Sequence, residues 1–320
     1  MIRPLLAVVL ACSILFAVEP EAEKMKAFIQ GEWAMMSAQD DGYDFLNRGK
    51  VNPAAPRVLR VKGDAWELNY KDRRLEKYTT TIHGDASPLL IDCAPANTGS
   101  GTAAVLGAMA FQDDILAVCL QLSHRDRGRT TKLDDTNDGA KDHAVDKLWF
   151  FMREDGFITV GLPSESNPNF TRQPDAWTGT EVLTSTATGA AITGPAIGKG
   201  GAIMRFYLEA DSGQGLTCIA GGTEIALSTL PSGAFQRVQA SVGGKTIVAR
   251  THTCSINGNG KPGPVYHSVD LRITPDRLRV WAVGTTIADL PLAAPLSAPI
   301  QLKATAPGVA LRMVRWKTLP

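Results

Sequence analysis

The sequence predicts an all-β fold, with an eight-stranded antiparallel barrel in the first half and a two-sheet β-sandwich in the second. Short segments in which apolar and polar residues alternate recur along the chain. Turn signals such as Lys62-Gly63-Asp64 separate these segments at regular spacing. The 30 Gly and 19 Pro residues, together with many Thr and Val residues, favour strands joined by turns over helices.

Residues 1–18 are typical of a secretory signal peptide. Arg3 supplies the positive charge, and an apolar run from Leu5 to Val18 follows before an acidic segment ends it. We expect cleavage after Ala17 and export to the periplasm or the extracellular space. The alternative is a lipobox that ends at Cys12, which would then be lipidated. The run is shorter than the ~20 apolar residues that span a bilayer, and we expect no transmembrane segment elsewhere.

The first half, residues 21–153, is predicted to form the barrel. A short helix is expected over Glu21 to Ile29, and a polar surface loop over His124 to Asp146. Eight short strands at regular spacing favour an antiparallel barrel. The strand candidates are Trp33–Ala38, Arg57–Lys62, Ala65–Tyr70, Lys77–His83, Leu89–Cys93, Ala104–Phe111, Ile115–Leu122 and Lys147–Met152.

The second half, residues 175–320, is predicted to form the sandwich. Residues 154–174 are expected to be a linker, because a Pro-, Ser- and Asn-rich run lies at their centre. About eleven strands in the remaining residues are too many for one flat sheet, so two packed sheets are expected. The candidates are Val182–Ala187, Ala190–Thr193, Ala202–Glu209, Leu216–Ala220, Glu224–Leu230, Phe235–Val242, Thr246–Cys254, His267–Ile273, Leu278–Val283, Ile300–Ala304 and Ala310–Lys317.

The net charge and the cysteine content limit the classes of partner and of bound metal that the sequence supports. A net charge of +1 provides no electrostatic footprint for nucleic acid. No cysteines have the C-x-x-C spacing of a zinc site, so we expect no metal, and no motif implies a cofactor. Four cysteines follow the signal, and an exported protein favours disulfides. One bridge per domain, Cys93–Cys119 and Cys218–Cys254, is the simplest pairing; buried thiols are the alternative.

Two sets of side chains in the second half are candidate site residues. Catalysis would need carboxylates or His residues that converge on one groove. The candidates for this role are Asp270, His267, Glu209 and Glu224. Aromatic rings stack on the flat apolar faces of sugars, although they also dominate the cores of β-sandwiches. The candidates for a ligand platform are Tyr266, Trp281 and Trp177.

Residues 21–153 resemble a family of lipocalin-like domains of unknown function that is best known from exported planctomycete proteins. The resemblance implies an eight-stranded barrel whose base is plugged by Trp33. It rests on an ordered series of motifs: Gly31-Glu32-Trp33, Leu90-Ile91-Asp92, Leu106-Gly107-Ala108-Met109-Ala110-Phe111, Asp114-Ile115-Leu116-Ala117-Val118-Cys119-Leu120 and Leu148-Trp149-Phe150-Phe151-Met152-Arg153.

Residues 175–320 are similar to the 3-keto-disaccharide hydrolase domain family, which implies a concanavalin-like jelly roll. Two positions depart from the family pattern: Val283 replaces a turn asparagine, and His267 stands at a usual Asn or Thr position. The similarity rests on Trp177-Thr178-Gly179-Thr180-Glu181, Ile203-Met204-Arg205-Phe206-Tyr207-Leu208-Glu209, Tyr266-His267-Ser268-Val269-Asp270 and Leu278-Arg279-Val280-Trp281-Ala282-Val283-Gly284.

These observations lead to two functional hypotheses and a weaker third. The first is an exported cell-envelope binding or scaffold protein, with carbohydrate or an envelope protein as the partner of the sandwich. The second is a glycoside-processing hydrolase or lyase that acts through the second domain. In the first hypothesis the barrel holds a small apolar ligand or is filled with side chains. The third is a protease inhibitor or lipid carrier built on the barrel, and a carrier would need a hollow barrel.

Overall fold

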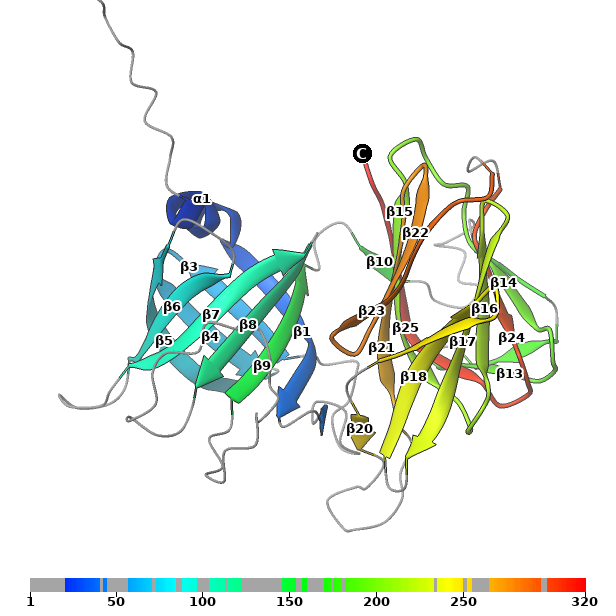
Figure 1. The fold of residues 1–320 in the computed structure, drawn as a ribbon, viewed down its shortest axis with the longest axis horizontal. Helices are drawn as coiled ribbons and strands as arrows, with labels where there is room; N and C mark the ends of the chain where they lie inside the picture. The colour runs from blue at the N-terminus through cyan, green and yellow to red at the C-terminus, as the bar shows by residue number, and fades with distance from the viewer. Residues whose placement is uncertain are drawn as a thin grey trace, which may run out of the picture.

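The structure is a computed structural model of the 320-residue chain. It describes residues 21–40, 43–44, 57–70, 73–84, 88–96, 104–112, 114–121, 146–153, 157–159, 170–173, 175–179, 182–232, 235–249, 252–254, 265–294 and 298–320. The proposed signal peptide, Cys12 and most of the predicted His124–Asp146 loop lie outside the described residues. The described strands form a barrel followed by a sandwich, which confirms the predicted all-β fold (Figure 1).

Eight antiparallel strands close the barrel, and all eight were predicted. Hydrogen bonds join each strand to the next along the chain, and the last strand pairs with the first. The barrel strands are β1 (Gly31–Asp40), β3 (Arg57–Lys62), β4 (Ala65–Tyr70), β5 (Arg73–His83), β6 (Leu89–Pro95), β7 (Val105–Gln112), β8 (Ile115–Gln121) and β9 (Asp146–Arg153). Large apolar side chains such as Trp66, Met109 and Phe151 line the interior, each at most 3% exposed.

The helix α1 (Glu21–Phe28) lies at one end of the barrel (Figure 1), and the Trp33 ring lies 6.3 Å from the ring of Phe28 in this helix. The Trp33 side chain is fully buried, and its indole Nε1 donates a hydrogen bond to the carbonyl of Ile29 at 2.8 Å. The guanidinium of Arg153, at the end of β9, lies 4.6 Å from the Trp33 ring and also donates to the carbonyl of Phe28. The cation–π contact between Arg153 and Trp33 therefore joins the last barrel strand to the first.

The sandwich consists of two sheets, which we name the docked sheet and the outer sheet. The docked sheet has the strand order β12-β13-β25-β15-β21-β22-β23, with β10 also paired to β25. Its strands are β10 (Ile158–Thr159), β12 (Trp177–Thr178), β13 (Val182–Ser185), β15 (Ala202–Glu209), β21 (His267–Ile273), β22 (Arg277–Ala282), β23 (Thr285–Pro291) and β25 (Ala310–Thr318).

The outer sheet packs its inner face on the docked sheet. Its order is β11-β14-β24-β16-β17-β18, with β19 and β20 both paired to β18. The strands are β11 (Thr171–Arg172), β14 (Ala191–Thr193), β16 (Gly215–Ala220), β17 (Thr223–Ser232), β18 (Phe235–Val242), β19 (Lys245–Val248), β20 (His252–Cys254) and β24 (Gln301–Ala304). Leu216, Ile225 and Val238 of this sheet share one buried core with Phe206 and Val269 of the docked sheet.

Several features of the sandwich differ from the prediction, and one is that the predicted strand Thr246–Cys254 is divided into β19 and β20. Strands β10 and β11 lie within residues 154–174, so part of the predicted linker pairs with sandwich strands. Strand β23 was not predicted; a two-residue turn, Val283-Gly284, joins it to β22, and both residues have positive φ (45° and 82°). Asn and Gly adopt this turn more readily than a β-branched residue does.

The barrel and the sandwich are connected in two ways. Strand β2 (Tyr43–Asp44) pairs antiparallel with β1 and parallel with β20 of the outer sheet, so backbone hydrogen bonds run from one domain to the other. The outer face of β1, β8 and β9 also packs on the docked sheet. We call this apolar contact the docking seam; its buried residues are Met36, Ile115, Cys119, Leu148, Phe150, Met152, Tyr207, Tyr266 and Trp281.

No helix in the part of the chain that the structure describes has the length and apolar character needed to cross a bilayer.

Candidate functional site

The structure does not bring the four candidate catalytic residues together. Asp270, on β21, points out of the sandwich toward the barrel and is 3% exposed. His267, three residues earlier, points between the two sheets, where its Nε2 lies 3.4 Å from the side-chain oxygen of Gln236 on β18. Glu209 ends β15 and pairs with Arg312. Glu224 is exposed on β17 of the other sheet.

The three candidate platform aromatics are all buried. Trp177 belongs to the sandwich core at 2% exposure. Tyr266 and Trp281 face outward from the docked sheet, but the docking seam covers them. The Trp281 ring lies 5.5 Å from the ring of Phe150 of the barrel, in an edge-on arrangement. The barrel therefore covers the surface on which a sugar was expected to stack.

Four charged side chains meet at the edge of the docking seam, and we call them the seam network: Asp114, Arg205, Asp270 and Arg272. Arg205 Nε donates to Asp270 Oδ2 at 3.0 Å, and Arg205 Nη2 lies 3.6 Å from Asp114 Oδ2. Arg272 Nη1 donates to Asp114 Oδ1 at 3.0 Å. Because Asp114 lies in the β7–β8 turn of the barrel, the network joins the two domains by ion pairs.

Arg205 is the central residue of this network. Its side chain is 1% exposed, although it is a cation on a strand that is otherwise almost wholly apolar. Besides its two carboxylate contacts, its Nη1 donates to the carbonyl of Arg153 at 3.1 Å, and its guanidinium lies 4.3 Å from the Phe157 ring. A buried cation needs such partners, because its desolvation costs several kcal/mol.

The pKa of Asp270 is raised to about 6. Burial is the main cause because it disfavours the charged carboxylate, and the negative charge of Asp114 acts in the same direction. The cations Arg205 and Arg272 oppose this shift without cancelling it. Burial thus favours the neutral, protonated form of Asp270.

A cavity beside the seam network has a volume of about 10 Å³. It is lined by Asp114, Ile115, Asp270, Arg272, Arg279, Trp281 and Thr286. About 10–15 Å³ of this kind of volume holds a single water molecule, whereas sites for drug-sized ligands measure ~300–1,000 Å³. The raised pKa of Asp270 would suit a general acid, but no sugar fits beside it in the docked structure.

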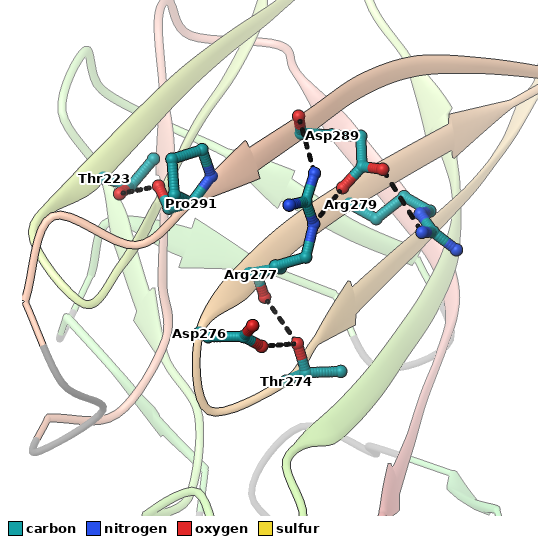
Figure 2. A network of polar contacts seen from close by, with 7 residues as sticks. All are labelled: Thr223, Thr274, Asp276, Arg277, Arg279, Asp289 and Pro291. Atoms are coloured by element: carbon teal, nitrogen blue, oxygen red, sulfur yellow. Dashed lines mark hydrogen bonds and ion pairs between the residues drawn. The ribbon is translucent and has the colours of Figure 1, made fainter.

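A second, exposed network lies on the neighbouring hairpin (Figure 2). Asp289 of β23 accepts from Arg277 Nε at 2.9 Å and from Arg279 Nη2 at 3.2 Å. These hydrogen bonds hold the pKa of Asp289 below its usual range. Arg279 also lines the water-sized cavity, so this rim network reaches the seam network through one arginine.

The predicted disulfides are wrong, because Cys93, Cys119 and Cys218 are buried thiols. Cys93 points into the barrel interior, whereas Cys119 points outward into the docking seam, so the two sulfurs lie on opposite faces of the sheet. Cys218 packs in the sandwich core, and the side chain of Cys254 lies outside the described ones. Burial raises the pKa of both Cys93 and Cys218 to about 12, as expected of inert structural thiols.

Among the described residues, no group of three or more His, Cys, Asp and Glu side chains could hold a metal ion.

We expect His267→Gln to make the protein less sensitive to acid. Burial lowers the pKa of His267 to about 3, so between pH 6.5 and 3 the unfolded chain binds a proton that the folded chain does not. The folded state of the wild type therefore loses stability as pH falls through this range. Urea unfolding midpoints at pH 7 and pH 4.5 should differ less in the variant than in the wild type. An unchanged difference would show that His267 does not contribute to acid sensitivity.

Three residues of the seam network, Asp114, Arg205 and Arg272, were not predicted as site residues. The sequence could have indicated Arg205, since a lone arginine in the otherwise almost wholly apolar strand Ala202–Glu209 needs a partner when it is buried. Nothing in the sequence indicated Asp114, because an aspartate in a turn is ordinary and its partner Arg272 is 158 residues away in the chain.

No family model matches this chain, and no curated protein matches it either. Three solved structures with weak similarity to this chain are a transglycosylase, a fructosyltransferase and a GH43 protein. The apo Crh5 transglycosylase has 11% identity and a TM-score of 0.31, covering 51% of this chain and 84% of its own. A fructosyltransferase from A. japonicus has 9% identity and a TM-score of 0.34, and the match covers 83% of this chain and 64% of that protein. The GH43 protein BlXynB from Bacillus licheniformis has 9% identity and a TM-score of 0.34, and the match covers 82% of this chain and 72% of that protein. At TM-scores below 0.5 these similarities carry no argument about the fold or the activity of this chain.

Proposed function

We propose that this chain is a non-catalytic binding or scaffold protein of the cell envelope, which contacts a polysaccharide through the outer face of its outer sheet. The observation that carries the proposal is the use of the two sandwich faces. The barrel covers the outward face of the docked sheet, so Tyr266, Trp281 and Asp270 are buried there. The outer sheet is the remaining broad face of the sandwich. The envelope location rests on the signal pattern of residues 1–18.

The outward face of the outer sheet carries a row of register partners across five strands, and four of the five are polar. Lys303, Thr217, Ala226, Ser241 and Thr246 lie side by side as register partners on β24, β16, β17, β18 and β19. None of them is buried. Next to this polar row, Gln239 Nε2 donates to Ser228 Oγ at 2.9 Å, and Ser241 Oγ lies 2.9 Å from Thr246 Oγ1. Hydroxyl and amide groups on a flat sheet suit many weak hydrogen bonds to a hydroxyl-rich polymer.

The hydrolase hypothesis remains an alternative that the geometry does not favour. Asp270, His267 and Glu209 face different surroundings, and Glu224 lies on the opposite sheet. A glycosidase needs two carboxyl groups that flank one bond. Asp114 shares Arg205 and a water-sized cavity with Asp270, and this cavity has no room for a sugar between the two carboxyl groups.

We expect the double variant Thr217→Arg/Ser241→Arg to lose retention on envelope polysaccharide. Two long cations on the polar row block the face, while outward substitutions of this kind usually change stability by no more than ~0.5 kcal/mol. The measurement is affinity electrophoresis of the full chain through gels with and without the polysaccharide. Thr81→Arg, on an exposed position of β5 in the barrel, is the matched control and should be retained normally.

Equal retention of the double variant and the wild type would overturn the assignment of the outer sheet. Release of reducing sugar by the wild type, abolished in Asp270→Asn, would instead favour the hydrolase.

A further inference from the structure

We propose that the contact between the barrel and the docked sheet is a proton-operated latch, in which a proton on Asp270 strengthens docking and its loss loosens docking. This inference is independent of the proposed polysaccharide partner, because it concerns the opposite face of the sandwich.

The latch rests first on the composition of the interface. The docking seam is apolar, with Phe150 and Met152 of the barrel packed on Tyr207 and Trp281 of the docked sheet. The seam network is a charged group at its edge, and Asp270 is buried there in the docked protein. Apolar contacts of this kind hold the domains together at any pH, whereas a buried carboxyl group makes the docking energy depend on its charge.

Charged side chains face Asp270 from each neighbouring element. Arg205 of β15 contacts it directly, Arg272 stands two residues along its own strand, and Arg279 of β22 lines the same cavity. Asp114 is the charge that the barrel contributes. Undocking therefore takes a negative charge away from Asp270 and leaves its arginine neighbours in place.

The direction of the effect follows from this arrangement. In the docked state burial and Asp114 raise the pKa of Asp270 to about 6. Undocking admits water and removes Asp114, so the pKa falls toward the ordinary value near 3.9. The docked state then binds a proton that the undocked state releases. Docking must strengthen as pH falls from 7 toward 4.

The chain contains its own reporters for docking. Cys119 is buried in the docking seam, so its thiol becomes accessible when the domains separate. Cys93 lies inside the barrel and Cys218 inside the sandwich core, so each becomes accessible only when its own domain opens. Labelling of the three thiols, read peptide by peptide, distinguishes undocking from unfolding.

The test labels the full chain with 4,4′-dithiodipyridine, which reacts in mild acid, at pH 4.5 and pH 7.5. Rates are normalised at each pH to that of a cysteine peptide. The protection of Cys119 should be at least about tenfold greater at pH 4.5 than at pH 7.5, because the docked state binds a proton on Asp270 that the undocked state releases. Protection of Cys93 and Cys218 should not follow this profile.

Two variants test whether Asp270 is the group responsible. Asp270→Asn is neutral at every pH, so the pH dependence of Cys119 protection should disappear while Cys93 and Cys218 stay protected. Asp114→Asn removes the like charge and should move the midpoint of the profile to lower pH. The latch is overturned if Cys119 protection is flat in the wild type, if Asp270→Asn keeps the wild-type profile, or if the three thiols always react together.

Discussion

Replacement of Arg205 by Ala is expected to destabilise the docked protein by ~3–5 kcal/mol at pH 7.5, the usual cost of removing one partner from a buried ion pair. The substitution leaves Asp270 buried at 3% exposure without its direct cation, and Asp114 loses one of its two arginines. The loss is measured as a shift in the urea unfolding midpoint, with hydrogen exchange of the docked sheet as the probe of unfolding. The loss should shrink at pH 5, because a neutral Asp270 needs no opposite charge.

Arg277→Ala is the matched control for this experiment. Arg277 also pairs with an aspartate, Asp289, but its side chain is 45% exposed on the rim of the sandwich (Figure 2). Water replaces such a partner, so little change in the midpoint is expected. If Arg205→Ala is as mild as Arg277→Ala, or if its effect is the same at pH 5 and pH 7.5, Arg205 does not stabilise the buried charge of Asp270.

Two adjacent phenylalanines of β9 should have different effects when each is replaced by Ala. Phe151 points into the barrel, is fully buried, and lies 6.2 Å from the Trp149 ring. Phe151→Ala should lower the free energy of unfolding of the barrel by ~3–5 kcal/mol, because it opens a cavity in a packed core. The urea midpoint and the labelling rate of Cys93 both measure this loss.

Phe150→Ala should act on docking instead, because Phe150 points outward and packs on Trp281. Cys119 should be labelled faster, while Cys93 inside the barrel keeps its protection. The two variants remove the same side chain from neighbouring positions, so each controls for the other. If Phe150→Ala exposes Cys93 as much as Phe151→Ala does, the two faces of β9 are not energetically separate.

The barrel strands were predictable because the sequence pattern that identifies each strand lies within that strand and its flanking turns. A strand with one face toward the core alternates in sequence, as Trp66 and Leu68 do with Glu67 between them, and turn residues mark where it ends. Strand β23 escaped prediction because Val283 stands where a two-residue turn favours asparagine. The disulfide prediction failed because cysteine counts say nothing about which face of a sheet each thiol occupies.

The candidate site was far less predictable, since it depends on how two domains meet. Asp270 points out of the sandwich, and its surroundings are determined by Asp114 from the barrel. Tyr266 and Trp281 have the pattern of an exposed platform, and only the packing of Phe150 on them shows otherwise. Contacts across more than a hundred residues leave no periodic signal in the sequence.

The position of β25 has a consequence for how the protein reaches this state. β25 lies between β13 and β15, so the docked sheet cannot close until residues 310–318 are available, whereas the barrel closes once β9 is in place at residue 153. Between these two events the finished barrel presents Met36, Phe150 and Met152 to solvent with nothing to cover them. Exposed apolar patches of this kind promote aggregation. We therefore expect the half-folded chain, rather than either completed domain, to be the species that needs protection by a chaperone.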